Sequence, residues 1–460
     1  MKTVFAHFRI VDAAQDVDGA IVVEDGLIKQ IVPHSMLNSS AFLAEIADAD
    51  HYIDGTKLKH AAPPHEPHVI MPAFIDLHAH FRDPGFPQKE TLESATLAAV
   101  KGGYTTLVCM ANTSPPTDTL AAAAALKARS DALGLIDLYP AMSLTKGMEG
   151  KELTDIPHTT LTHEGGSLPP GSGPAVLHHP PLRGPGPRNA PATPQTGTTI
   201  NPRSGFIRIL SEDGKDIHDA GLFAAALRAA AEAGIPVSCH CDRDGENAAT
   251  ERALRLAKET GATIHIAHVS TKEAVAMIAA AKKERPGKVT AEATPHHFFL
   301  NDWRADELGP DTFGKVAPPL RSEADRKAVL EAILDGTIDI IATDHAPHTD
   351  SDKEAGAPGF SGLETAFAVA CTALVASGES DLCHLSQLMA AAPASILSLE
   401  DRGLLEPGRR ADFAIVQHET LRTIDKASFR SRGKNTPFHG MELSGMVFMT
   451  VFGGKIVYEF

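Results

Sequence analysis

The feature that most constrains the fold is a regular alternation of short apolar runs and Ala-rich stretches between residues 71 and about 400. It predicts strands at 104–110, 205–210, 235–239, 263–268 and 338–342, and helices at 91–101, 220–233, 248–260 and 271–285. Such alternation favours parallel βαβ units, and a (β/α)8 TIM-type barrel over 71–404 accommodates them. A doubly wound α/β sheet is the alternative, but the chain has no glycine-rich dinucleotide fingerprint to support it.

The two ends of the chain have the sequence pattern of strands separated by turns. Residues 3–11, 20–32, 411–417 and 446–460 are rich in Val, Ile and Phe and are broken by turn residues. These patterns are typical of strands. We therefore expect 1–70 and 405–460 to form one small, composite β domain.

A Pro/Gly-rich segment at about 157–204 interrupts the alternation. Residues 157–202 contain 11 of the 32 prolines of the chain. Proline at this density blocks both helices and sheet ladders. We expect an insertion on the barrel surface, in the place where the third barrel helix would otherwise lie.

Charge and composition limit the partners. The net charge of −16 disfavours nucleic acid and anionic membranes. No apolar run is long enough to predict a membrane span, and the first residues lack the apolar core of a signal peptide. The five cysteines form no C-x-x-C pair, which argues against a zinc ribbon and a disulfide framework. A cytoplasmic location is the simplest expectation.

The strongest local signal is the pair His78 and His80, which directly follows the apolar run 69–77. Residues two apart on a strand share a face, so both imidazoles could hold one metal ion. The carboxyl end of a barrel strand is also where active sites of barrel enzymes form. An H-x-H pair alone is weak evidence, because such pairs also occur by chance.

Further candidate ligands lie where other apolar runs end, namely Asp213, His240, His268 and Asp344. Each has an ordinary structural explanation, since an Asp can cap a helix and a His can be a buried core residue. Their joint occurrence at strand ends predicts a metal centre. Nitrogen and carboxylate ligands suit zinc, with manganese or cobalt as alternatives.

Ordered segments along the chain resemble the signatures of the dihydroorotases, a family of the amidohydrolase superfamily. They are MPAFIDLHAHFRDPGFPQKET at 71–91, MANTSP at 110–115, SEDGK at 211–215, SCHCD at 238–242, HVSTKEA at 268–274, ATPHHFFL at 293–300, KVAPPLR at 315–321, ATDHAPH at 342–348 and GFSGLETAF at 359–367. The resemblance covers nearly the whole chain except about 40–65 and 157–204. It fits the long-chain type of the family best.

The resemblance implies one or two zinc ions per chain. His78 and His80 would bind one metal, and His240 and His268 would bind the second. Asp213 would stand where related enzymes often carry a carboxylated lysine. We do not expect carboxylation of Lys215, and we expect His265, His296 and His297 to be structural or to support the ligands.

The implied activity is the reversible interconversion of N-carbamoyl-L-aspartate and L-dihydroorotate in pyrimidine biosynthesis. Asp344 would be a metal ligand and the catalytic proton shuttle. Substrate would be held by Arg82, Asn112 and His348, with the backbone of 359–362 close to the ring.

One departure from the family pattern keeps other activities open. Ala317 stands where the family usually has Asn, so one substrate hydrogen bond is missing. The alternatives are a hydantoinase, dihydropyrimidinase or allantoinase, or a non-catalytic subunit that associates with aspartate transcarbamoylase. The first group typically has a lysine in place of Asp213, and degenerate subunits usually lose metal histidines. A homodimer is also possible.

Overall fold

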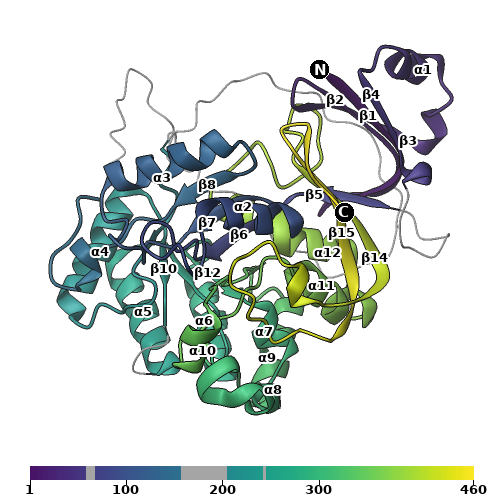
Figure 1. The fold of residues 1–460 in the computed structure, drawn as a ribbon. Helices are drawn as coiled ribbons and strands as arrows, with labels where there is room; N and C mark the ends of the chain where they lie inside the picture. The colour runs from purple at the N-terminus through teal and green to yellow at the C-terminus, as the bar shows by residue number, and fades with distance from the viewer. Residues whose placement is uncertain (59–67, 157–204, 242–244) are drawn as a thin grey trace, which may run out of the picture.

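The computed structural model describes residues 1–58, 68–156, 205–241 and 245–460 (Figure 1). The predicted insertion at 157–204 lies outside these residues. A barrel of strands and helices forms the larger part of the molecule, and a twisted β-sheet lies beside it.

Within the described residues, eight parallel strands form the barrel in chain order. They are β6 (Phe74–Ala79), β7 (Tyr104–Cys109), β8 (Asp137–Pro140), β9 (Leu210–Ser211), β10 (Val237–Cys239), β11 (Ile264–Ile266), β12 (Val289–Ala293) and β13 (Ile340–Ile341). They pair as one group of three and one of five. Single bridges from Met142 to Leu210 and from Ala79 to His345 join the two groups and close the ring. The predicted (β/α)8 barrel is confirmed.

Helices follow the barrel strands and cover the outside of the ring (Figure 1). The α-helices are α2 (Leu92–Lys101), α3 (Leu120–Leu133), α4 (Ala220–Ala233), α5 (Glu246–Thr260), α6 (Lys272–Glu284), α7 (Pro295–Phe299), α8 (Asp302–Leu308), α9 (Glu323–Leu334), α10 (Asp350–Glu354), α11 (Ala366–Ala370), α12 (Leu382–Ser386) and α13 (Ala392–Ile396). Short 3-10 or π turns are η3 (Lys146–Met148), η4 (Gly309–Phe313), η5 (Cys371–Ala376) and η6 (Gln387–Ala391). None of the helices in the described parts of the chain is long and apolar enough to cross a membrane.

Local sequence signals explain where the long helices begin and end. The side chains of Thr91, Asp219 and Thr271 accept hydrogen bonds from backbone N–H groups in the first turns of α2, α4 and α6. Gly234 ends α4 with a φ of 67°, a left-handed conformation that glycine adopts without strain.

The second layer is a sheet built from both ends of the chain. Its strand order is β16-β15-β14-β5-β1-β2-β3, and β4 also pairs with β1. The strands are β1 (Lys2–Val11), β2 (Asp16–Glu24), β3 (Leu27–Pro33), β4 (His51–Asp54), β5 (Val69–Pro72), β14 (Phe413–Thr423), β15 (Glu442–Phe452) and β16 (Lys455–Glu459). The helix α1 (Ser40–Ala47) and the turns η1 (His34–Met36), η2 (Gly55–Lys57) and η7 (Lys426–Ser428) complete this part. The expected β-rich sheet from the two termini is therefore present.

Two expected strands differ from the structure. The apolar run 69–77 divides at Ala73, so that β5 pairs with β1 and β14 in the outer sheet while β6 begins the barrel. The strand expected at 205–210 forms a ladder only at its end, where Leu210 pairs with Val237. Composition predicts extended backbone in both cases, but it does not show which neighbour pairs with it.

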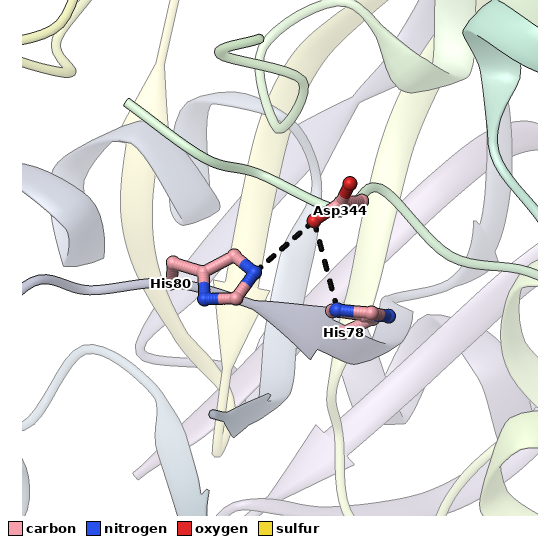
Figure 2. A group of neighbouring side chains, drawn as sticks. All are labelled: His78, His80 and Asp344. Carbon is pink, nitrogen blue, oxygen red and sulfur yellow. Dashed lines mark hydrogen bonds and ion pairs between the residues drawn. The ribbon is translucent and has the colours of Figure 1, made fainter. Parts of the chain in front are cut away.

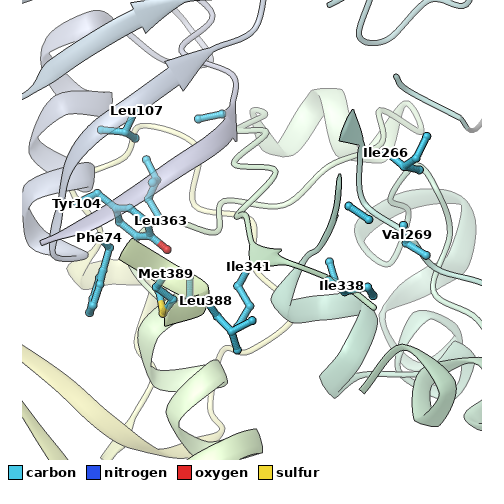
Figure 3. Packing of buried hydrophobic residues seen from close by; sticks show 14 of the residues in the cluster. Phe74, Tyr104, Leu107, Ile266, Val269, Ile338, Ile341, Leu363, Leu388 and Met389 are labelled. Carbon is cyan, nitrogen blue, oxygen red and sulfur yellow. The ribbon is translucent and has the colours of Figure 1, made fainter. Parts of the chain in front are cut away.

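Side-chain alternation along β6 separates core from site. Ile75 and Leu77 pack in an apolar cluster with Ala394 and Leu397 at α13. Asp76 and His78, which alternate with them, are buried and polar, and they contact Thr343 and Glu292 from other parts of the barrel. A larger apolar cluster joins strands and helices around the barrel (Figure 3), with the rings of Phe74 and Tyr104 5.6 Å apart. The polar residues are thus held in a rigid apolar frame.

Candidate metal centre and substrate pocket

The six predicted ligands converge at the carboxyl end of the barrel. Each lies at or just after a barrel strand, and five of them are almost fully buried; His240 is slightly more exposed. The carboxyl ends of parallel barrel strands meet at one face, so residues distant in sequence become neighbours there. The set is His78, His80, Asp213, His240, His268 and Asp344.

One group of three consists of His78, His80 and Asp344 (Figure 2). Asp344 Oδ1 lies 3.1 Å from His80 Nε2 and 3.6 Å from His78 Nε2. The ring nitrogens of both histidines and one oxygen of the carboxylate therefore face a common point.

Asp213 connects this group to the other histidines. Its carboxylate oxygens lie 3.2 Å from His78 Nε2, 3.4 Å from His80 Nε2 and 3.1 Å from His240 Nδ1. His240 Nδ1 is 2.7 Å from His268 Nε2. A second group of possible ligands is His78, Asp213 and His268, which shares His78 with the first group.

The donor set fits a divalent metal ion. His78 Nε2 and Asp213 Oδ1 are buried and lie 3.2 Å apart, but within the described residues neither atom makes a hydrogen bond of normal geometry. Buried polar atoms without partners are rare in proteins, and each such atom calls for an explanation such as a bound ion. Imidazole nitrogens and carboxylate oxygens are the ligands that zinc and similar metals take.

The pKa values of three candidate ligands, Asp213, Asp344 and His268, favour the protonation states that bind a metal ion. Burial alone would raise the pKa of Asp213, but His78, His240 and His80 outweigh it and hold that pKa well below its usual value. The pKa of Asp344 is likewise lowered against burial by His78 and His80. Burial and the neighbouring histidines lower the pKa of His268 to about 3. At neutral pH both carboxylates are ionised and His268 is neutral, which is the form that binds metal.

The backbone around the site is unusual. His268, Asp344 and Arg82 have positive φ angles of 34°, 45° and 57°. Left-handed backbone is uncommon in residues other than glycine, and it concentrates at functional sites. Three of the seven non-glycine residues with positive φ in the described parts of the chain thus lie at this end of the barrel, two of them being candidate ligands.

Glu292 is a site residue that the sequence analysis missed. It is fully buried in β12, and its carboxylate accepts from His78 Nδ1 at 2.6 Å, His265 Nε2 at 2.9 Å and the His268 backbone N–H at 3.2 Å. Although burial opposes ionisation, His78 and His265 lower its pKa. A carboxylate behind an imidazole orients the ring so that Nε2 faces a metal. A charged residue inside the apolar strand 289–293 was the available signal.

Other buried groups support the same ligands. Asp76 Oδ1 accepts from the backbone N–H groups of His78 and Thr343, at 3.2 and 3.0 Å. Burial raises the pKa of Asp76 to about 6. His265 also meets the hydroxyl of Thr290 at 2.8 Å, so its structural role is a support for Glu292.

The cluster opens into a pocket of about 360 Å³. The three predicted substrate-binding residues, Arg82, Asn112 and His348, all line this pocket. All the candidate metal ligands except His78 line it as well, and so do Ala317 and Gly359. Asn112 already contacts two candidate ligands, since its Oδ1 lies 2.9 Å from His80 Nδ1 and its Nδ2 donates to Asp213 at 3.3 Å. Asn112 thus orients ligands as well as lining the pocket.

Arg82 and His348 form another part of the pocket wall. Arg82 Nη2 lies 3.2 Å from His348 Nε2, and Arg82 Nε donates to Pro347 O at 3.4 Å. Both side chains are largely buried, and burial lowers the pKa of the Arg82 guanidinium. Within the described residues no carboxylate forms an ion pair with Arg82. An anion in the pocket would meet this free charge.

The remaining predicted residues surround the pocket. Lys215 lines it, next to Gly214 and Asp216. His297 is buried between the Thr294 hydroxyl at 2.7 Å and Pro318 O at 2.9 Å, which holds the loop that carries Ala317. His296 is buried beside it, and its ring lies 5.3 Å from that of Phe360.

Comparison with known proteins gives a consistent result. A model of the amidohydrolase family matches residues 69–457. The chain is 33% identical over 472 residues to a dihydroorotase from Clostridium botulinum (strain Eklund 17B / Type B), with 100% of both chains covered. It is 40% identical over 421 residues to a dihydroorotase from Geobacillus sp. (strain WCH70), covering 85% of this chain and 87% of the relative.

Solved structures support the fold. The L-hydantoinase (dihydropyrimidinase) from Arthrobacter aurescens superposes with a TM-score of 0.77 at 23% identity, covering 99% of this chain and 96% of that one. A dihydropyrimidinase from Brevibacillus agri NCHU1002 gives 0.77 at 20% identity, covering 100% and 95%. The chain therefore belongs to the amidohydrolase family, and its sequence is similar to those of the dihydroorotases.

Proposed function

We propose that this protein is a metal-dependent dihydroorotase, which interconverts N-carbamoyl-L-aspartate and L-dihydroorotate. The observation that carries the proposal is the juxtaposition of a metal-ligand cluster and the cationic Arg82 in one pocket. The similarity of nearly the whole chain to proteins named dihydroorotase supports the same reaction.

Zinc is the proposed metal, with one or two ions held by His78, His80, Asp213, His240, His268 and Asp344. These ligands offer nitrogen and carboxylate oxygen, which suits zinc. A metal bound there would supply Lewis acidity, which lowers the pKa of water and polarises a carbonyl group. Glu292 and Asn112 would keep His78 and His80 in the orientation needed for binding.

Asp344 is the proposed proton carrier. It lines the pocket, and its lowered pKa keeps it ionised at neutral pH, so the carboxylate is free of the proton that it would have to accept. In the hydrolytic direction it would take a proton from the attacking water and pass it to the ring nitrogen as the amide bond breaks. In the synthetic direction the same group would take the proton from that nitrogen and return it to the departing water.

The part of the pocket wall formed by Arg82 and His348 would orient the substrate. Arg82 and His348 would donate to the carboxylate on the ring, and the backbone at Gly359 would lie along the ring edge. Bound in this way, the substrate would have its amide bond at the metal and its carboxylate away from it. Ala317 also lines the pocket, at the position where the resemblance to the dihydroorotases implies an Asn.

A related hydrolase of neutral rings is the main alternative, because Ala317 departs from the dihydroorotase pattern. Arg82 favours a substrate with a negative charge. The complete ligand set favours an enzyme over a non-catalytic subunit. A cytoplasmic location, a homodimer and an association with aspartate transcarbamoylase remain predictions from the sequence, as does the division into domains at 1–70, 71–404 and 405–460.

A direct assay tests the proposal. Purified protein is loaded with zinc, and ring opening of L-dihydroorotate is followed spectrophotometrically. We expect turnover that is lost after chelation and restored by added zinc. The absence of turnover in zinc-loaded, folded protein, with ring opening of a hydantoin or allantoin instead, would contradict the dihydroorotase assignment.

A further inference from the structure

Lys89 lies behind the substrate wall and contacts His348 from the side away from the pocket. The turn after β6 brings it there, since Phe86 N–H donates to Arg82 O at 2.9 Å and Lys89 N–H donates to Phe86 O at 2.9 Å. Lys89 Nζ lies 3.3 Å from His348 Nδ1 and 3.4 Å from Asp352 Oδ1. The other ring nitrogen of His348 faces Arg82 Nη2 at 3.2 Å.

Each ring nitrogen of His348 therefore lies within hydrogen-bond distance of a group that can only donate, whereas the Asp352 carboxylate oxygen nearest to Nδ1 is farther away, at 4.0 Å. Lysine and arginine carry no acceptor, and a neutral imidazole has one N–H and one lone pair. Burial, Arg82 and Lys89 lower the pKa of His348 to about 3, so the ring is neutral at pH 7. The single lone pair of the neutral His348 ring can therefore accept a hydrogen bond from only one of the two cations. The other contact is between two donors.

The surroundings of Lys89 and Arg82 indicate which of the two donates a hydrogen bond to His348. Lys89 is held between His348 and Asp352 outside the pocket lining, whereas Arg82 and His348 both line the pocket. If Lys89 takes the lone pair on Nδ1, the proton is on Nε2 and projects toward Arg82. Two donors then lie 3.2 Å apart at the pocket wall, and a single anionic oxygen between them would accept from both.

We propose that Lys89 is a positioning residue that sets the tautomer of His348, so that His348 Nε2–H and the Arg82 guanidinium converge on one carboxylate of the substrate. By this means Lys89 makes the pocket select rings that carry a carboxylate over neutral rings. The identity of that ring rests on the proposed function, but the tautomer does not.

The tautomer is tested without any ligand. Protein labelled with 15N-histidine is measured by NMR, and the His348 signals are identified by their loss in His348→Gln. We expect a protonated Nε2 and an unprotonated Nδ1 in the wild type and in Lys89→Arg, and a changed tautomer population in Lys89→Met. An Nδ1–H tautomer in the wild type, or an unchanged tautomer in folded Lys89→Met, would overturn the proposal.

Selectivity is tested by calorimetric binding of orotate and of uracil, a matched ring without the carboxylate. We expect Lys89→Met to weaken orotate binding by roughly tenfold or more, with uracil binding unchanged and Lys89→Arg close to the wild type. Lys151→Met, which removes an exposed lysine, is the control for loss of charge.

A double variant separates positioning from a general structural role. If Lys89 acts through His348, adding Lys89→Met to His348→Gln should weaken orotate binding by less than about twofold. Equal loss of orotate and uracil binding, or full additivity with His348→Gln, would refute the role of Lys89. Failure of the wild type to bind orotate would instead count against the proposed function, and the NMR result would then decide the tautomer alone.

Discussion

The two walls of the pocket are opposite in hydrogen-bonding character. The metal wall is rich in acceptors, since ionised Asp213 and Asp344 stand among imidazole nitrogens and Glu292 lies behind them. The other wall is rich in donors, with Arg82 and Lys89 on either side of His348. Arg82 in the second wall forms no ion pair with a carboxylate of the described residues, whereas the nearby Asp352 pairs with Lys89 at 3.4 Å.

This difference explains how an acidic protein can bind an acidic substrate. The net charge of −16 describes the whole surface, while binding depends on a few groups within several ångströms. In the proposed function, a metal ion would bind to the first wall and the carboxylate of the substrate would bind to the second. The spacing between them then determines which bond of the substrate meets the metal.

Removing the base from the metal wall should have the largest effect. We expect Asp344→Asn to lower kcat for dihydroorotate by roughly 10²–10⁴-fold, because an amide cannot accept the proton. Steady-state kinetics measures the loss, and elemental analysis shows whether metal is retained. Near-normal turnover in a folded, metal-loaded variant would exclude Asp344 as the proton carrier.

Weakening the support of the metal wall should have an intermediate effect. Glu292→Gln removes the charge that orients His78, and we expect metal affinity to fall by about 10–100-fold. Competition with a chromophoric chelator measures the affinity. Glu152→Gln, at an exposed glutamate, is the control. Equal affinities in the two variants would mean that Glu292 does not tune the metal centre.

Strengthening the donor wall should have a smaller effect. Ala317→Asn adds a neutral polar group worth about 0.5–1.5 kcal/mol, so KM for dihydroorotate should fall by up to about tenfold with kcat nearly unchanged. Ala317→Leu adds similar bulk without the amide and serves as the control. A KM that rises in both variants would show that the space beside Ala317 is needed, for example by a water molecule.

The Pro/Gly-rich insertion should contribute least. Replacing residues 160–200 with a short linker should leave the thermal midpoint and the metal content nearly unchanged, because this composition cannot bury an apolar core. Thermal unfolding and elemental analysis measure both. A large drop in either quantity would mean that the segment packs on the barrel.

The fold was predictable from the sequence where periodicity and end signals agreed. The helix predicted at 220–233 matches α4 because Asp219 and Gly234 mark its ends. Pairing was harder to predict, since the apolar run 69–77 serves two different sheets. A run of apolar residues shows that a strand is buried, but the partner strand depends on distant parts of the chain.

In the candidate site, too, some residues could be predicted from the sequence and others could not. His78 and Asp344 could be predicted because strand ends meet at one face of a barrel. Glu292 was missed because it lies inside a strand, and its function depends on rings from two other strands. Lys89 was missed because only the turn at 82–89 brings it to His348. Contacts of this kind depend on tertiary geometry and have no spacing rule in the sequence.

The most direct test compares a charged and a neutral ring on one zinc-loaded preparation. The ratio of kcat/KM for L-dihydroorotate to that for dihydrouracil measures whether the two walls act together. We predict that dihydroorotate is turned over far faster, and that Arg82→Met removes most of this preference. Faster opening of the dihydrouracil ring than of the dihydroorotate ring by the wild type would contradict the proposal that the two walls act together on a charged substrate.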